Sequence, residues 1–135
     1  MDARRLIIDC DPGQDDAVAL LLAFGSKDEL DIAGITCVAG NVALRMTVRN
    51  ALRVRELAGR QDVPIFAGCP RPMMRKLETA EEVHGKTGLD GVDLPEPSLG
   101  VDPRHAVDFI IEACRSAPEG GLTLCPIGPL TNIAL

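Results

Sequence analysis

The chain has 135 residues, of which 46% are hydrophobic and 25% are charged. This length and composition are typical of one globular domain. With 20 acidic and 14 basic residues, the formal net charge is −6. Nucleic acid and anionic membranes are therefore excluded as expected partners, because binding to phosphate groups needs a basic surface. No apolar run approaches the roughly 18 residues of a membrane-spanning helix.

Short apolar runs alternate with stretches of helical periodicity along the chain. Buried strands are expected at four of the apolar runs, residues 6–8, 32–38, 64–67 and 122–125. Helices are expected over residues 17–24 and 44–58, and after residue 102. This order predicts an α/β fold, an open and mostly parallel sheet with helices on both faces.

Glycine and proline mark the ends of the expected helices. Gly25 and Gly59 follow the first two helices as stop signals. Asp102 and Pro103 predict the start of the third helix, with the aspartate as cap and the proline at the first helical position.

Two regions depart from the regular alternation. Residues 68–103 are rich in proline and glycine, which predicts a long loop that is either functional or disordered. Residues 128–135 begin a helix and stop within an apolar run, without a capping glycine or a polar tail. We expect from this end that the domain is truncated and that its uncovered apolar surface favours a homo-oligomer.

Five cysteines are spread along the chain without a Cys-x-x-Cys pair. Their odd number and wide spacing predict neither a zinc site nor a disulfide framework. Most lie in apolar segments, where a reduced cysteine packs as a small hydrophobic residue. A reducing, cytoplasmic location is therefore expected.

Four carboxylates follow the first expected strand within eight residues: Asp9, Asp11, Asp15 and Asp16. Carboxylates this close together repel each other unless a cation lies between them, and all-oxygen ligands favour Ca²⁺ or Mg²⁺. The turn at Pro12-Gly13 can fold the later pair back toward Asp11. The sequence therefore predicts a cation site at the carboxyl end of this strand.

The acidic cluster allows other interpretations. Asp15 or Asp16 could cap the following helix while the remaining carboxylates are surface charges. An EF-hand loop starting at Asp9 fails, because it would need glycine and glutamate where Gln14 and Leu20 stand. A phosphatase of the haloacid dehalogenase type also has Asp-x-Asp after its first strand, but its usual continuation is Gly-Thr and not Pro-Gly.

The stretch DCDPGQDDA, residues 9–17, resembles the signature Asp-x-Asp-Pro-Gly-x-Asp-Asp-Ala of the inosine–uridine-preferring nucleoside hydrolases. Further similarities to that family lie along the rest of the chain, at residues 40–41, 49–51, 64–68, 84–88 and 128–132. The resemblance covers essentially the whole chain, but only about the first half of the family's usual domain.

The resemblance implies a calcium-dependent enzyme that hydrolyses the N-glycosidic bond of ribonucleosides to give ribose and a free base. It implies that Asp11, Asp16 and the backbone carbonyl of Ile127 bind Ca²⁺. Asp11 would also take a proton from the attacking water. Asp9 would lie behind these ligands and orient the loop.

The resemblance also implies where the ribonucleoside binds. Asp15 and Asn41 would hydrogen-bond the ribose hydroxyls, and the segment around His84 would lie near the substrate as a flexible lid. The family takes a further calcium ligand and its leaving-group chemistry from a C-terminal half that this sequence lacks. We therefore expect this chain alone to be inactive. A non-catalytic fragment with a weak cation site, or a self-association module, is the alternative.

Overall fold

A computed structural model of the chain describes residues 3–135, and its centre is a sheet of four parallel strands in the order β3-β2-β1-β4. The strands are β1 (Arg4–Cys10), β2 (Leu30–Cys37), β3 (Ile65–Ala67) and β4 (Thr123–Pro126). Each expected strand is present. The second half of β1 is buried. The last five residues of β2 are also buried, except Ala33, as expected of inner strands.

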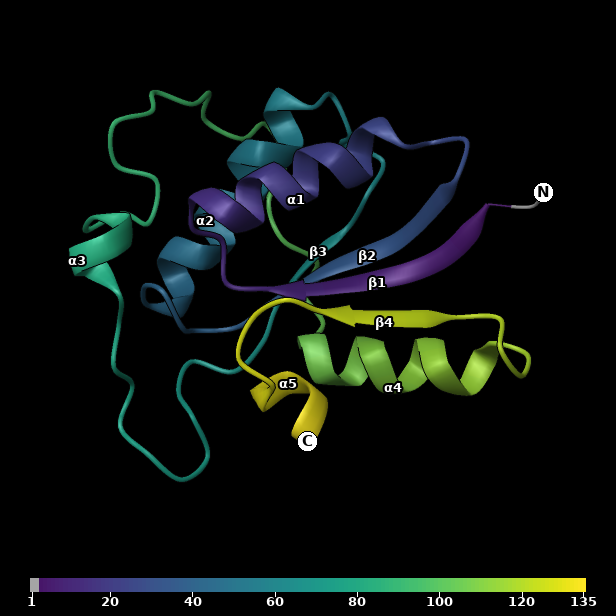
Figure 1. Ribbon diagram of the computed structural model, residues 1–135. Coiled ribbons are helices and arrows are strands. Elements are labelled where there is room, and N and C mark those ends of the chain that lie inside the picture. Colours follow the sequence, from purple (N-terminus) through teal and green to yellow (C-terminus); the bar gives the residue numbers. More distant parts are fainter. Residues whose placement is uncertain (1–2) are drawn as a thin grey trace.

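Helices cover both faces of this sheet, as predicted (Figure 1). On one face lie α1 (Gln14–Gly25) and α2 (Leu44–Leu57), whose apolar residues share a core with Ile8 and Ile35 of the sheet. On the other face α4 (Ala106–Ser116) packs through Phe109 against Phe66, with ring centroids 3.8 Å apart. The short helix α5 (Thr131–Ala134) lies beside α4.

The predicted glycine stops are confirmed at the ends of the first two helices. Helix α1 ends at Gly25, and α2 ends at Leu57 with Gly59 two residues later at φ +63°. A positive φ is easily adopted by glycine, so Gly59 turns the chain toward β3 without strain.

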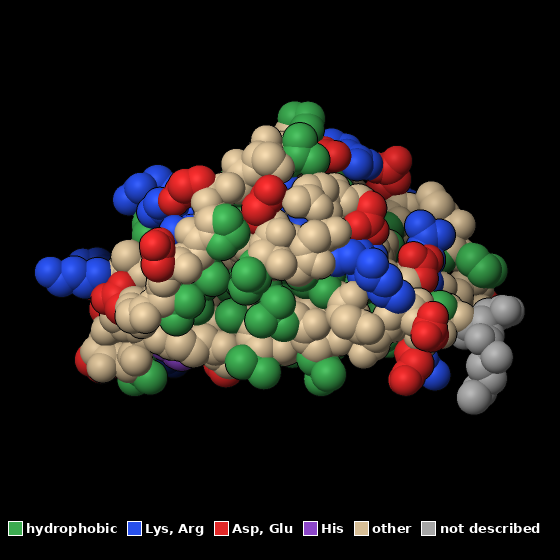
Figure 2. All heavy atoms as spheres, turned by 90° about the horizontal axis from the view of Figure 1, so that it is seen from above, with side chains coloured by type: hydrophobic (Ala, Val, Ile, Leu, Met, Phe, Trp, Pro, Cys, Tyr) green, Lys and Arg blue, Asp and Glu red, His purple; other side chains and the backbone are tan. Residues whose placement is uncertain are grey.

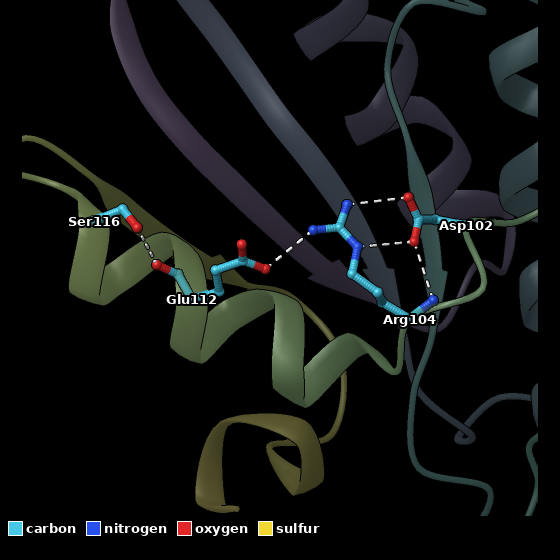
Figure 3. Close-up of polar contacts among 4 residues, drawn as sticks. All are labelled: Asp102, Arg104, Glu112 and Ser116. Atoms are coloured by element: carbon cyan, nitrogen blue, oxygen red, sulfur yellow. Dashed lines mark hydrogen bonds and ion pairs between the residues drawn. The ribbon is translucent and has the colours of Figure 1, made fainter.

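The predicted start of the third helix was wrong by several residues. Helix α4 begins at Ala106, and the side chain of His105 caps it by accepting a hydrogen bond from the backbone N–H of Val107 at 3.2 Å. Asp102 instead accepts hydrogen bonds from the backbone N–H and the guanidinium of Arg104, each at 3.0 Å (Figure 3).

The Arg104 side chain explains why the helix is delayed. Its guanidinium reaches back to Asp102 and forward to Glu112 on α4 (Figure 3). The guanidinium also lies 5.1 Å from the ring centroid of Phe66. Asp102 is therefore engaged with a side chain and is not available to cap a helix. This cluster joins the end of the long loop to the outer face of α4.

The predicted long loop has a defined course and contains one short helix, α3 (Glu81–His84). It is fixed at both ends: Gly68 donates a hydrogen bond to the carbonyl of Cys37, and Asp102 pairs with Phe66 in an isolated bridge. Within the loop, Ala80 donates a hydrogen bond to the carbonyl of Asn41. In between, Arg53 of α2 donates a hydrogen bond to the carbonyl of Leu94. Among the described residues, no helix is both long and apolar enough to cross a membrane.

Candidate active site

The strand order brings the predicted site residues to one edge of the sheet. Because all four strands are parallel and β1 lies between β2 and β4, the segments that follow these three strands meet at their carboxyl ends. The chain proceeds from β1 to β2 and β3 on one side and returns to β4 on the other side. Ligand sites of open α/β sheets form at such a switch point.

Asp11 lies at the centre of this edge and is 5% exposed. Its carboxylate accepts a hydrogen bond of 2.7 Å from the backbone N–H of Asn41, whose side-chain amide donates to the Asp11 carbonyl at 3.0 Å. Two glycines enclose the carboxylate. A Cβ atom would come within 2.1 Å of one carboxylate oxygen at Gly40 and within 2.7 Å of the other at Gly128. Larger residues at these positions would displace Asp11.

Asp16 folds back onto Asp11, as the turn at Pro12-Gly13 predicts. It lies in the first turn of α1 and is 3% exposed, and its Oδ2 atom accepts a hydrogen bond of 3.0 Å from the backbone N–H of Asp11. The N-cap residue of α1 is Gly13, without a side-chain cap. The capping interpretation of Asp16 was therefore wrong, because its carboxylate is turned toward the preceding strand.

The electrostatics of this pair follow from its burial. The pKa of Asp16 is raised to about 7, mainly because burial removes the carboxyl group from solvent. The neighbouring charge of Asp11 raises this pKa further. Burial also raises the pKa of Asp11. Both carboxyl groups are therefore difficult to ionise at the same time. Such a pair favours binding of either a shared proton or a cation.

Asp9 lies beneath the pair on β1 and is buried. One carboxylate oxygen accepts hydrogen bonds from Thr36 at 2.6 Å and from Asn132 at 2.8 Å, whereas the other has no hydrogen-bond partner among the described residues. Burial raises the pKa of Asp9, although these two hydrogen bonds oppose the rise. The backbone carbonyl of Asp9 accepts a hydrogen bond from the N–H of Ile127 at 2.8 Å.

The remaining predicted site residues surround this centre. The hydrogen bond between Asp9 and Ile127, together with the contact between Gly128 and Asp11, places the peptide that follows β4 beside the acidic pair. Asp15 is exposed at the start of α1, next to Asp16 in the chain. The structure thus brings Asp9, Asp11, Asp16 and Ile127 together and leaves Asp15 at the surface of the same edge.

His84 lies over the acidic loop, as its predicted place near the site requires. Its Nδ1 atom is 2.5 Å from Oε1 of Gln14, whose side-chain amide donates to the His84 carbonyl at 3.3 Å. The imidazole lies against Gly13, where a Cβ atom would come within 2.5 Å of Nδ1. The segment around His84 is therefore closed down on the loop in this structure.

Buried amide and hydroxyl groups that support the acidic residues were not predicted. Thr36, Asn50 and Asn132 are buried and each bonds to the backbone or side chain of an acidic-loop or strand-end residue. The asparagines stand in segments similar to the family, but nothing local in the sequence assigns them a partner. Polar residues within apolar, buried segments are the signal that could have identified them.

Among residues 3–135, no three side chains of His, Cys, Asp or Glu come together in an arrangement that could hold a metal ion. The oxygen atoms that the chain brings together are those of Asp11, Asp16 and the neighbouring backbone. Hard cations prefer this type of donor.

Comparison with known proteins agrees with the geometry. The family model described as inosine-uridine preferring nucleoside hydrolase matches residues 6–135. A pyrimidine-specific ribonucleoside hydrolase, RihA, of Photobacterium profundum is 51% identical over 98% of this chain, and an inosine-uridine preferring nucleoside hydrolase of Crithidia fasciculata is 47% identical over 98%. The chain spans 42% of the length of each of these relatives.

A solved structure supports the same relationship. A purine-preferring ribonucleoside hydrolase from Gardnerella vaginalis superposes with a TM-score of 0.88 at 34% identity, over 97% of this chain and 42% of that one. The match in sequence and in fold extends over nearly all described residues, including the acidic edge of the sheet. The chain therefore belongs to the inosine-uridine preferring nucleoside hydrolase family.

Proposed function

We propose that this chain provides the calcium-binding and water-activating part of an enzyme that hydrolyses the N-glycosidic bond of ribonucleosides. The observation that carries the proposal is the buried pair Asp11 and Asp16, held together by a 3.0 Å hydrogen bond at the carboxyl end of β1. Membership of the family favours this reaction over the phosphatase alternative.

The donors around the pair fit a hard cation. Asp11 and Asp16 would hold Ca²⁺ with their carboxylates, and Ile127 with its backbone carbonyl. Burial is the main cause that raises the pKa of both carboxyl groups, and a bound cation would favour their charged forms and offset their repulsion. When bound, Ca²⁺ would supply positive charge that favours the deprotonated form of an attacking water. The relatives are longer, and we propose that they complete the ligand set with residues outside this chain.

The chain's own residues divide the remaining tasks. Asp11 accepts a proton from the water as the general base. Asp15 is exposed at the same edge, where it binds ribose hydroxyls together with Asn41. Asn41 also fixes Asp11 through two hydrogen bonds. Asp9 holds the strand end to which Asp11 is attached.

The segment around His84 covers the acidic loop and excludes water from bound substrate. The His84 side chain contacts the exposed side chain of Gln14 and lies against the backbone of Gly13. Such contacts can break and re-form as ribonucleosides enter and products leave.

We also propose that the chain self-associates and resides in the cytoplasm. Apolar side chains gather on the face covered by α1 and α2 (Figure 2). Val18 is 67% exposed and Leu22 is 72% exposed on α1, beside an apolar hollow lined by Leu21, Leu57 and Val92. Apolar surface of this kind favours contact with a second copy.

Two measurements test the proposed function. Calorimetric titration with Ca²⁺ should show weak binding to this chain that is lost in Asp16→Asn, whereas Asp28→Asn, at an exposed carboxylate, should retain it. An assay of base release from inosine and uridine should show activity only when the chain is extended by the region that its relatives possess. Binding that survives Asp16→Asn would contradict the assigned cation site.

A further inference from the structure

A strap of ten residues, 80–89, crosses the acidic loop formed by residues 11–16. It starts with a hydrogen bond of 2.8 Å from the N–H of Ala80 to the carbonyl of Asn41, and it ends with Leu89 buried in the core beneath α1 and α2. The strap is thus fixed at both ends to elements that also hold the acidic residues.

Asn50 connects the strap to the acidic loop from within α2. Its side chain is buried, and its Nδ2 atom donates one hydrogen bond of 2.9 Å to the carbonyl of Pro12 and another of 2.7 Å to the carbonyl of Thr87. An amide nitrogen carries two hydrogen atoms, so both are used, and each binds a different segment.

The strap approaches this junction closely enough to require glycine. Gly88 has φ +84°, and a Cβ atom there would come within 2.8 Å of Nδ2 of Asn50 and 3.1 Å of the Pro12 carbonyl oxygen. Three segments therefore meet around one buried amide. Displacement of any one of them leaves a donor or a carbonyl without its partner.

We propose that Asn50 is a positioning residue that holds the acidic loop and the strap in one fixed arrangement. The Pro12 carbonyl belongs to the turn that folds Asp16 back onto Asp11, so the bond from Asn50 fixes that turn. The same amide fixes Thr87, so ordering of the strap and ordering of the acidic pair are coupled. The coupling itself stands on these contacts alone, and only its effect on cation affinity rests on the proposed function.

Hydrogen exchange measured by NMR on the metal-free chain tests the coupling. Asn50→Ala should raise exchange at the amides of both Gly88 in the strap and Asp11 in the acidic loop by about tenfold or more. The buried Ile35 amide, which bonds to the Pro64 carbonyl, reports global stability. Its exchange rate should change less than the rates at Gly88 and Asp11. A general loss of stability would raise all three rates together and would overturn the proposal.

Arg53→Met is the matched control on the same helix. Arg53 also binds the long loop, through the Leu94 carbonyl, but makes no bond to the acidic loop. The control should raise exchange near residue 94 and leave the Asp11 amide within about twofold of wild type. An equal effect of Asn50→Ala and Arg53→Met at Asp11 would contradict a specific role for Asn50.

Gly88→Ala disturbs the same junction from the side of the strap. It tests the coupling independently if the Asn50 variant does not fold. Its methyl group should push Thr87 off Asn50 and raise exchange at Asp11, although residue 88 makes no contact with the Asp11 side chain. Faster exchange in the strap alone, with Asp11 unchanged, would show that the two segments are not coupled.

A calcium titration of the same proteins separates this inference from the proposed function. If wild type binds Ca²⁺, Asn50→Ala should weaken the affinity by about tenfold and Arg53→Met by less than twofold. Unchanged affinity in Asn50→Ala would overturn the coupling to the cation. If wild type does not bind Ca²⁺, the proposed cation site fails, and the exchange rates still decide the role of Asn50.

Discussion

The side-chain amide of Asn132 donates a hydrogen bond of 2.8 Å to the carboxylate of Asp9, and so joins α5 to an inner strand of the sheet. The same side chain accepts a hydrogen bond from the N–H of Cys69 at 2.8 Å and donates to the carbonyl of Cys37 at 3.0 Å. Asn132 thereby contacts the ends of three strands directly beneath the acidic pair.

Replacement of Asn132 by alanine should destabilise the chain markedly. The change leaves the Cys69 N–H without a partner, and it removes one of two hydrogen bonds to the Cys37 carbonyl and one of two to the buried Asp9 carboxylate. We expect a loss of about 2–4 kcal/mol in the free energy of unfolding, measured by urea denaturation.

Ser116→Ala provides the control for Asn132→Ala. Ser116 is exposed, and within residues 3–135 its hydroxyl bonds only to the Glu112 carbonyl of α4, so its loss should cost less than about 0.5 kcal/mol. Similar losses in the two variants would show that the Asn132 network contributes little to stability.

The network of Asn132 also shows what could be predicted from the sequence. The order of strands and helices, and the return of Asp16 to Asp11, were predictable because periodicity, glycine stops and the Pro12-Gly13 turn act over short distances. The bond between Asp9 and Asn132 joins residues 123 positions apart, and no local pattern specifies it.

Local signals also failed where tertiary contacts compete with them. Asp102-Pro103 is a common start for a helix, yet the Asp102 carboxylate is bound to Arg104, and the helix begins later with His105 as its cap. Asp16 was a plausible capping residue, but its carboxylate is bound by the Asp11 backbone across the turn. In both cases the carboxylate accepts a hydrogen bond from a group that lies before the helix, and not from the first N–H groups of that helix.

The raised pKa of Asp16 predicts how stability depends on pH without metal. The pKa of an ordinary aspartate is 3.8, whereas the pKa of Asp16 in the folded chain is about 7, so the folded state binds more protons between these pH values. The free energy of unfolding should therefore fall as pH rises from about 4 to about 7 and then level off.

Thermal unfolding followed by circular dichroism across this pH range measures the effect. Asp16→Asn cannot ionise at this position, so it should show a smaller fall in stability. Addition of Ca²⁺ should stabilise wild type more at pH 8 than at pH 5, because protons compete for the same carboxylates. A profile that rises from pH 4 to pH 7 in wild type would contradict the assigned burial and repulsion.

Self-association through the α1 and α2 face should depend on its exposed apolar side chains. Leu22→Lys places a charge on the apolar patch and should lower the average mass measured by light scattering at high protein concentration. Met74→Lys, at a residue that is equally apolar and highly exposed but lies in the long loop, should leave the mass unchanged. A monomeric wild type would overturn the proposed homo-oligomer.

Asp11→Asn tests the assignment of the base in a chain extended by the region that the relatives possess. Asparagine can still accept the hydrogen bond from the Asn41 N–H, so the fold should be retained. The variant loses the proton acceptor and one negative charge of the cation site together. We expect kcat for inosine or uridine to fall by at least about 10³-fold.

Asp15→Ala separates substrate binding from this role of Asp11. Because Asp15 is exposed and bonds to neither Asp11 nor Asp16 in the hydrogen bonds of the described residues, its loss should raise KM for the nucleoside and leave Ca²⁺ affinity within about twofold. Asp11→Asn should instead lower both kcat and Ca²⁺ affinity. Near-normal kcat in Asp11→Asn would show that another group accepts the proton. Loss of Ca²⁺ affinity in Asp15→Ala would show that the cation binds closer to the exposed Asp15 than proposed.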